Sequence, residues 1–341
     1  MTLVGVDLHT RDESVAVLDT ATGELRERRI RHEGEEIERF YQALAPATVA
    51  IESTGYAIWF HALMRRLGHT LVVGDAAKIR AAVVRKTKTD RRDARHLLTL
   101  LSEQRFPTIW VPDPEARDLR ALIAHRMRLV RVRTMLRNGV HAIALNYRLA
   151  LGPSLFTRRG RAQLDQLALP PHTANRRDES LELLASLDSR LAVLDARIAT
   201  VAEATPEAVR LMTHPGVGPL TALATILILG PIDRFPTGKH VASYIGLAPR
   251  VASSAGKHHL GGITKQGNTL LRYFLGQAGQ VALRADPDLK RLYYRVLQRR
   301  GKARAKVAVA RTLLVRLYIM RRDHIDYAEF RRRGHPSAAK A

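Results

Sequence analysis

The sequence predicts an α/β N-terminal domain, a helical spacer and a second, mainly helical domain. Over residues 1–105, short runs rich in β-branched residues alternate with amphipathic helical patterns. Over residues 115–145 and 181–201, apolar residues recur at helical spacing without interruption. Residues 206–325 combine further helical patterns with glycine- and proline-containing turns. These boundaries predict domains at 1–105, 106–205 and 206–325, followed by a basic tail at 326–341 that we expect to be disordered.

Within the first domain the elements follow a definite order. Hydrophobic patterns predict strands at 3–8, 14–18, 25–32, 48–52 and 70–73, and helices at 33–44 and 56–67. A turn at 21–24 joins the second and third strands, and Gly68 ends the second helix. A three-stranded meander followed by helix, strand, helix, strand and helix is the order of an RNase H-like fold.

Four acidic residues lie where that order would bring them together. Asp7 lies at the end of the first strand and Glu52 at the end of the fourth, while Asp90 and Asp93 lie in the first turn of a later helix. Singly, each has an ordinary explanation as a solvated acid, a capping acid or a pair favoured by the helix dipole. Together they suit two Mg²⁺ ions, or Mn²⁺ ions, about 3.5–4 Å apart, which activate an attacking oxygen and stabilise a leaving oxygen.

The charge of the chain points to a polyanionic partner. Its 56 lysines and arginines outnumber its 32 acids, for a net charge of +24, and nucleic acid is the simplest partner for that excess. Basic residues also surround the acidic pair, which suits a metal ion that meets a phosphate backbone; the candidate nucleic-acid contacts there are Lys86, Lys88, Arg91, Arg92 and Arg95.

The chain has no cysteine, which excludes disulfides and zinc–thiolate sites and fits a cytoplasmic protein. Its most apolar run, 220–229, is too short to span a bilayer, so we expect no membrane partner.

Three motifs carry a resemblance to a known family: Gly5-Val6-Asp7-Leu8-His9, Ile51-Glu52-Ser53-Thr54-Gly55 and Lys88-Thr89-Asp90-Arg91-Arg92-Asp93-Ala94. With them the chain resembles the DEDD transposases of bacterial insertion sequences. That family includes the Piv/MooV DNA invertases and the bridge-RNA-guided recombinases. The resemblance implies a RuvC-like N-terminal domain whose metal-binding, catalytic acids are Asp7, Glu52, Asp90 and Asp93. It also implies a bacterial, nucleoid-associated protein.

The middle region predicts a pair of long helices. A proline-containing linker leads into an arginine-rich helix at 115–145, and a loop-rich insertion at 151–174 precedes a leucine-rich helix at 181–201. A helical hairpin or a coiled-coil pair fits this pattern, and its apolar ridge could form a dimer seam. A spacer with a solvated arginine face is the alternative, and the two interpretations are compatible.

The last domain contains two stretches of interest. The first, His214-Pro215-Gly216-Val217-Gly218-Pro219, resembles a helix–hairpin–helix turn in which Gly216 and Gly218 let backbone N–H groups approach a phosphate. A plain interhelical turn is the alternative. The second stretch, 246–268, is predicted to be loop-rich, and helices with basic faces follow at 269–284 and 302–321.

That second stretch contains two adjacent serines, Ser253 and Ser254, before Ala255-Gly256. By composition alone they form a turn. The family's C-terminal domain, however, carries Gly-Leu-x-Pro, then a serine followed by glycine, then a basic Gly-Ile-Thr-Lys-x-Gly-Asn segment. The resemblance therefore implies that Ser254 is the nucleophile, with Lys257 and Lys265 as nucleic-acid contacts. Ala255 replaces the usual glycine, so Ser253 remains the alternative.

The sequence thus predicts a DNA transposase or recombinase. Metal-assisted attack by Ser254 on a phosphate would form a phosphoserine link and conserve the bond energy for rejoining. Donor and target DNA are the expected partners, and the resemblance adds a guide-like noncoding RNA and a dimer or tetramer with shared sites. One alternative is a magnesium-dependent junction or flap nuclease that uses water. The other is a nucleic-acid binder without catalysis.

Overall fold

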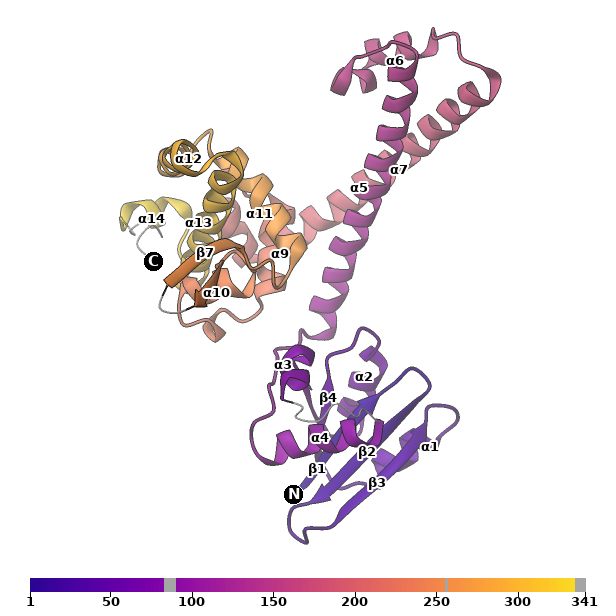
Figure 1. Cartoon of the computed structure of the whole chain (residues 1–341), viewed down its shortest axis with the longest axis vertical. Helices are drawn as coiled ribbons and strands as arrows, with labels where there is room; N and C mark the ends of the chain where they lie inside the picture. Colours follow the sequence, from indigo (N-terminus) through magenta and orange to yellow (C-terminus); the bar gives the residue numbers. More distant parts are fainter. Residues whose placement is uncertain (83–89, 255–256, 335–341) are drawn as a thin grey trace. The chain divides into compact units, whose positions relative to one another are not determined.

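The computed structural model describes residues 1–82, 90–254 and 257–334, and for 251–254 and 257–260 it describes the backbone alone. The chain divides into two compact units, Met1–Val111 and Pro112–Ala341 (Figure 1). Each unit has its own hydrophobic core, so each is described by itself.

The first unit is built on a five-stranded mixed sheet in the order β3-β2-β1-β4-β5. β1 pairs antiparallel with β2 and parallel with β4, while β2–β3 is antiparallel and β4–β5 parallel. The strands are β1 (Thr2–Leu8), β2 (Asp12–Asp19), β3 (Leu25–Arg31), β4 (Ala47–Glu52) and β5 (Thr70–Gly74). This order confirms the predicted RNase H-like fold.

Alternation along β1 determines which side chains face each layer of helices. Val4 and Val6 point into the core that α1 (Glu36–Gln42) and α2 (Ile58–Arg66) cover. Leu3 points to the opposite face, where it meets Ala94 and Leu98 of α4 (Asp90–Ser102). Figure 1 shows α4 lying across the sheet, and a short helix, α3 (Ala76–Ala81), follows β5. Asp7 shares the face of Leu3 and therefore emerges on the α4 side.

The second unit begins with the predicted pair of long helices, α5 (Pro114–Asn146) and α7 (Pro171–Glu203). They run antiparallel, and ion pairs join them at Arg126–Asp195 (2.9 Å) and Arg133–Asp188 (3.1 Å). The leucine ridge of α7 is buried inside this hairpin of a single chain: Leu184 shares a core with Val140 of α5. The ridge therefore has a partner within the chain before any second copy is considered.

The insertion between these helices is more ordered than the sequence predicts. It contains η1 (Gly152–Phe156) and α6 (Arg158–Asp165), and α7 begins at Pro171 instead of near residue 181. Proline fits the first helical turn because its missing N–H would have no partner there. The double proline at 170–171 therefore starts the helix, whereas the sequence reading took it for loop.

The remaining helices pack around α9, α11 and α13, whose apolar residues form the largest core. They are α8 (Pro206–Met212), α9 (Pro219–Leu229), η2 (Ile232–Arg234), α10 (Gly238–Tyr244), α11 (Thr269–Ala282), α12 (Pro287–Arg300), α13 (Lys302–Arg322) and α14 (Tyr327–Arg332). The predicted helices at 269–284 and 302–321 are confirmed. Residues 327–332, placed in the disordered tail by the sequence, instead form α14, because Asp326 caps it and Phe330 is buried in the core. No described helix combines the length and the apolar character needed to cross a membrane.

Between α10 and α11, where a loop-rich stretch was expected, the chain forms the hairpin β6 (Pro249–Ser254) and β7 (Lys257–Ile263). Its base is held by contacts that the sequence did not reveal. Gly246 and Gly267 both have positive φ, and a Cβ on Gly246 would lie 1.9 Å from the Gln266 carbonyl oxygen. Arg272 donates hydrogen bonds of 2.9 Å to the carbonyls of Ile245 and Gln266. These contacts bring the two strands together.

Candidate metal centre and serine hairpin

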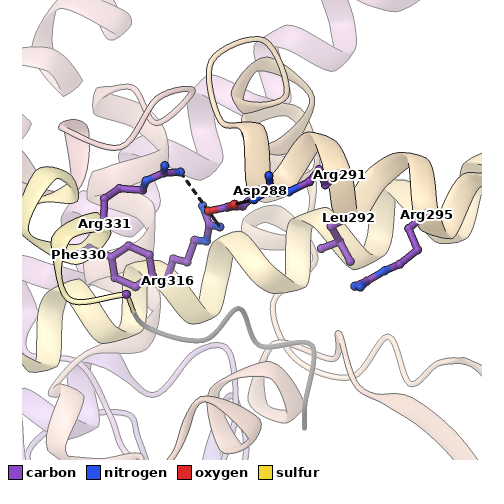
Figure 2. A pocket seen from close by; sticks show the side chains of 8 residues that line it. Asp288, Arg291, Leu292, Arg295, Arg316, Phe330 and Arg331 are labelled. Atoms are coloured by element: carbon purple, nitrogen blue, oxygen red, sulfur yellow. Dashed lines mark hydrogen bonds and ion pairs between the residues drawn. The ribbon is translucent and has the colours of Figure 1, made fainter.

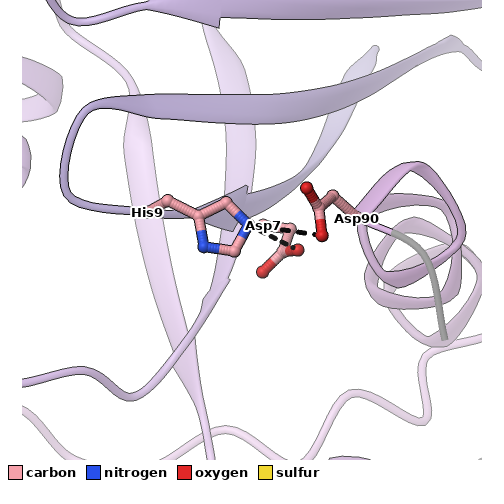
Figure 3. A group of neighbouring side chains, drawn as sticks. All are labelled: Asp7, His9 and Asp90. Carbon is pink, nitrogen blue, oxygen red and sulfur yellow. Dashed lines mark ion pairs between the residues drawn. The ribbon is translucent and has the colours of Figure 1, made fainter.

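Two predicted acids meet at the end of β1, together with a histidine. Asp7, His9 and Asp90 each offer one ligand atom, and these atoms all lie within 4.8 Å of one another (Figure 3). His9 Nε2 lies 3.2 Å from Asp7 Oδ2 and 3.6 Å from Asp90 Oδ1. Asp7 and His9 come from the end of β1, and Asp90 comes from the first turn of α4. The packing of α4 on β1 therefore assembles the group.

The donor set of this group fits a divalent metal ion. Two carboxylates supply the hard oxygens that Mg²⁺ and Mn²⁺ prefer, and an imidazole suits Mn²⁺ and later transition metals. His9 Nε2 is shielded from solvent, and its contacts with the Asp7 and Asp90 carboxylates do not have hydrogen-bond geometry. Asp7 is mostly shielded from solvent, whereas half of the Asp90 side chain is exposed. The site is thus open on the side from which a phosphate could approach.

His9 lies within one of the three motifs, but the sequence did not predict a role for it. The available signal was its spacing: His9 is two residues beyond Asp7, and side chains two apart on an extended chain share a face. A lone histidine after a strand is a weak signal. Only the position of Asp90 on a separate helix shows that the ring lies between two carboxylates.

The other two predicted acids lie nearby in the fold but outside this group. Val6 pairs in parallel with Ile51, so Asp7 and Glu52 follow as neighbours on adjacent strands and leave the sheet on the same face. Glu52 Oε1 lies 3.9 Å from Arg80 Nη2 of α3. Asp93 is half-buried, one helical turn beyond Asp90. The structure therefore brings Asp7 and Asp90 together, with Glu52 on the neighbouring strand β4 and Asp93 one turn further along α4.

Of the predicted nucleic-acid contacts near the acids, Lys86 and Lys88 lie outside the described residues. Arg91, Arg92 and Arg95 lie on the first turns of α4 and are exposed. Arg91 forms an ion pair with Glu27 of β3, and an Arg95 nitrogen lies 3.9 Å from the same carboxylate. Both arginine side chains are largely exposed, whereas the Glu27 side chain is only 12% exposed. The two cations are therefore accessible to a phosphate while they pair with a mostly buried carboxylate.

Both candidate serines lie at the tip of the β6–β7 hairpin. Ser254 ends β6 and pairs in register with Lys257, which begins β7, while Ser253 pairs with His258. Lys265 follows β7, is exposed and has a positive φ of 58°. The backbone therefore puts Ser254 and Lys257 opposite each other, at the end of β6 and the start of β7.

The two glycines of the helix–hairpin–helix-like turn differ in their surroundings. Gly216 has φ +84°, and a Cβ there would lie 2.5 Å from the carbonyl oxygen of Ala278 on α11. Gly218 is exposed at the N-terminus of α9, and a Cβ would meet nothing within 4 Å. Close packing against α11 is thus enough to explain the glycine at 216. The predicted phosphate contact stays a prediction at the exposed Gly218.

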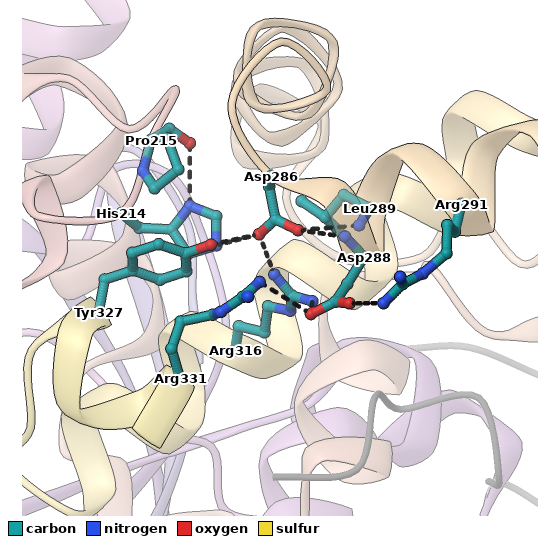
Figure 4. Close-up of polar contacts among 9 residues, drawn as sticks. All are labelled: His214, Pro215, Asp286, Asp288, Leu289, Arg291, Arg316, Tyr327 and Arg331. Atoms are coloured by element: carbon teal, nitrogen blue, oxygen red, sulfur yellow. Dashed lines mark hydrogen bonds and ion pairs between the residues drawn. The ribbon is translucent and has the colours of Figure 1, made fainter. Parts of the chain in front are cut away.

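Next to this turn lies a buried polar cluster centred on Asp286 (Figure 4). Asp286 accepts hydrogen bonds from Tyr327 (2.7 Å) and the Leu289 amide (2.9 Å), and it pairs with buried Arg316. Burial would raise the pKa of Asp286, but these donors together hold it below its usual value. His214 is fully buried beside the cluster, and burial lowers its pKa to about 4. The neutral ring hydrogen-bonds to the Pro215 carbonyl (2.9 Å).

An RNase H-like sheet with acidic side chains gathered at the end of β1 is typical of enzymes that use divalent metal ions to act on nucleic-acid phosphates. Residues 4–148 match the family described as DEDD transposase, IS110 type, and residues 208–294 match the transposase family IS116/IS110/IS902. Together these matches cover most of the chain. The protein belongs to the IS110/IS116/IS902 family of transposases, enzymes of DNA transposition, with a DEDD N-terminal domain.

Individual relatives agree with this assignment. A probable family 20 transposase of Pseudomonas aeruginosa is 29% identical over 289 residues, which are 81% of this chain and 84% of the relative. The transposase for insertion sequence element IS1111A of Coxiella burnetii is 32% identical over 67% of this chain and 65% of the relative. The pilin gene-inverting protein of Moraxella lacunata is 28% identical over 59% of this chain and 51% of the relative.

Proposed function

We propose that this protein cuts and rejoins DNA at the ends of an insertion sequence, with Asp7 and Asp90 as the central metal ligands. The observation that carries the proposal is the group formed by Asp7, His9 and Asp90 on an RNase H-like sheet. Glu52 and Asp93 complete the acidic set from the neighbouring strand and the next helical turn. Mg²⁺, or Mn²⁺ in its place, is the proposed cofactor.

A divalent metal ion held by these acids would neutralise charge at the scissile phosphate and would help to deprotonate the attacking hydroxyl. The chain's own residues have separate roles. Asp7 is mostly shielded and fixed on a strand, so it serves as the anchoring ligand, whereas half-exposed Asp90 faces incoming substrate. Arg91 and Arg95 at the same helix end would hold the flanking phosphates. Charge repulsion between the four carboxylates and DNA is relieved only when the cation is present.

We propose that the nucleophile is Ser254, with Ser253 as the alternative. Its Oγ would attack phosphorus, the bond from phosphorus to a bridging ribose oxygen would break, and the departing oxygen would leave as a hydroxyl. The serine proton passes to the solvent or to a base in the site. Attack by a hydroxyl of the second strand on the phosphoserine then reverses the step without water. Support comes from the hairpin, in which both serines lie at the end of β6 and pair with the first residues of β7, and from the family resemblance.

A guide-like noncoding RNA and further copies of the chain complete the proposed assembly, as a dimer or tetramer. Net charge supports an RNA partner as readily as a DNA partner. For the oligomer, the α5–α7 hairpin still offers exposed apolar residues, including Met135 and Val193, although its leucine ridge is internal. Met135→Asp with Val193→Asp therefore tests self-association without disturbing the buried ridge, and light scattering gives the readout.

The experiment that tests the metal-dependent function compares Asp90, which begins α4, with Glu103, which lies just beyond the end of this helix. Asp90→Asn should abolish Mg²⁺-dependent cleavage of DNA that carries the element's ends and should weaken Mn²⁺ binding by titration. Glu103→Gln, at the exposed far end of the α4 region, is the matched control and should behave like wild type. If Asp90→Asn cleaves normally in Mg²⁺, the acids at β1 and α4 are not the catalytic site.

A further inference from the structure

The second unit has two neighbouring surface hollows that share a wall. The first, about 600 Å³, lies among α12, α13 and α14, and the second, about 570 Å³, lies among β7, α12 and α13. Leu292 and Arg295 of α12 line both. Figure 2 shows these two side chains at one side of the first hollow. The two hollows are therefore adjacent on the surface along α12 and α13, and we refer to them together as the groove.

The second hollow has a cationic rim. Its lining includes Lys265, Arg295, Arg304 and Arg311 but, among the residues that the structure describes, no acid. None of these four side chains forms an ion pair with another described residue. Holding four cations together without counter-charges is unfavourable in the free protein, so an anionic ligand would be stabilised there.

The first hollow is also positive, although it contains one acid. Asp288 receives a hydrogen bond from Arg331 (3.0 Å) and lies 3.6 Å from Arg316 Nη2. Arg291 also pairs with it, so three arginines surround a single carboxylate (Figure 2). Arg316 is 3% exposed, and its Nε has no hydrogen-bond partner among the described residues. The cations that a ligand can reach at this end of the groove are therefore Arg291 and Arg331, whose side chains are exposed, and not the buried Nε of Arg316.

The floor of the second hollow is apolar. Leu247, Ile263, Leu292 and Val307 lie beneath the cationic rim. A strand of nucleic acid presents the matching pattern, because its phosphates are anionic while its sugars and base faces are largely apolar. A small inorganic anion would use the rim but not the floor.

We propose that this groove binds the sugar–phosphate backbone of a nucleic-acid strand and directs it toward the β6–β7 hairpin. The location supports the direction, since Gly261 and Ile263 of β7 form one wall, and β7 pairs with the strand that ends at Ser254. DNA and RNA share the backbone chemistry that the groove recognises. This inference rests on the nucleic-acid-binding part of the proposed function, and it assigns residues that no sequence motif indicated.

The test uses the full-length protein and fluorescence anisotropy with labelled single-stranded DNA, duplex DNA and RNA oligonucleotides over a range of salt concentrations. Arg295→Gln with Arg304→Gln removes two exposed cations of the rim. We expect affinity to fall about tenfold and the log–log salt slope to become shallower by about 1.4–1.8, the value for two lost phosphate contacts.

The matched control is Arg284→Gln with Lys290→Gln. It removes the same charge from exposed positions of the same unit that line neither hollow, and circular dichroism confirms that both variants are folded. A loss of affinity in the groove variant but not in the control supports the proposal. Whether the loss is seen with the DNA oligonucleotides, the RNA oligonucleotide or both identifies the ligand. Equal losses in the two variants, or none in either, would overturn the proposal. DNA cleavage by the wild type is measured in parallel. If the wild type cleaves DNA but the groove variant binds nucleic acid normally, the groove proposal is wrong and the proposed function stands. If the wild type does not cleave DNA, the proposed catalytic function is wrong.

Discussion

Gly5 of β1 lies directly against Ala94 of α4: a Cβ on Gly5 would stand 2.3 Å from the Ala94 carbonyl oxygen and 2.5 Å from the Leu98 amide nitrogen. The helix therefore rests on the backbone of the strand with no side chain between them. Asp7 follows Gly5 on the strand, and Asp90 begins the helix. This contact consequently sets how closely the two carboxylates approach.

We predict that Gly5→Ala weakens the metal site without altering any ligand. The added methyl must push α4 away from β1, which should cost about 1–3 kcal/mol of folding free energy and separate Asp90 from Asp7. Mn²⁺ titration and chemical denaturation measure the two effects. Gly139→Ala on α5, where a Cβ would meet nothing within 4 Å, is the control. It should weaken neither Mn²⁺ binding nor the stability of the fold. Unchanged Mn²⁺ binding in a folded Gly5→Ala protein would show that the contact does not set the site.

His9 offers a second prediction. If its Nε2 is a metal ligand, His9→Ala should weaken Mn²⁺ binding by about tenfold or more and Mg²⁺ binding less, because Mn²⁺ accepts nitrogen more readily. If the ring instead acts as a cation that holds the two carboxylates together, its removal should tighten binding of both metals. Calorimetric titration of wild type and variant with each metal distinguishes these outcomes, and tighter binding would contradict the ligand role.

The buried His214 predicts a pH-dependent stability. Burial lowers its pKa to about 4, whereas in the unfolded chain the ring titrates near its ordinary value of 6.5. Between these values the unfolded state binds the extra proton, so the free energy of unfolding should fall as pH falls. The expected loss from this group is about 2 kcal/mol between pH 7 and pH 5. Denaturation of wild type and His214→Phe at both pH values measures it; equal pH dependence in the two proteins would contradict the assignment.

Arg272 predicts a link between the hairpin base and catalysis. Its guanidinium joins the Ile245, Gln266 and Gly267 carbonyls, which precede and follow the two strands. Arg272→Gln should therefore loosen the hairpin, seen as faster amide hydrogen exchange in β6 and β7, and should reduce strand transfer while nucleic-acid affinity stays close to wild type. If exchange in the hairpin does not change, Arg272 does not position the serines.

The sequence predicted the RNase H-like unit well because its strands are short runs rich in β-branched residues, and because acids lie at the ends of the first and fourth of them. The β6–β7 hairpin was missed because its pairing depends on Arg272 and two positive-φ glycines, which act from outside the strands. The start of α7 at Pro171 was missed because a double proline also fits a loop. Within the site, Asp7 and Asp90 were predicted together, but His9 was not, since its role depends on a helix more than eighty residues away in the sequence.

The groove on α12 and α13 could not be read from the sequence for a related reason. Its cations come from a loop and two helices, and in sequence they look like ordinary basic faces. Only the packing of α12 against α13 shows that Arg295 and Arg304 lie on one hollow. Net charge predicted a nucleic-acid partner but gave no indication of where on the chain it binds.

One measurement tests the central claim, that metal-assisted serine attack makes this protein a strand-transfer enzyme. Wild-type protein is incubated in Mg²⁺ with labelled DNA that carries the element's ends, in the presence and absence of the proposed guide RNA, and is then denatured in SDS. The account predicts a protein–DNA adduct that resists SDS, is absent in Ser254→Ala and Asp90→Asn, and persists in Ser253→Ala. DNA nicked by Ser254→Ala and Ser253→Ala alike, with no adduct in wild type, would contradict it and favour a nuclease that uses water.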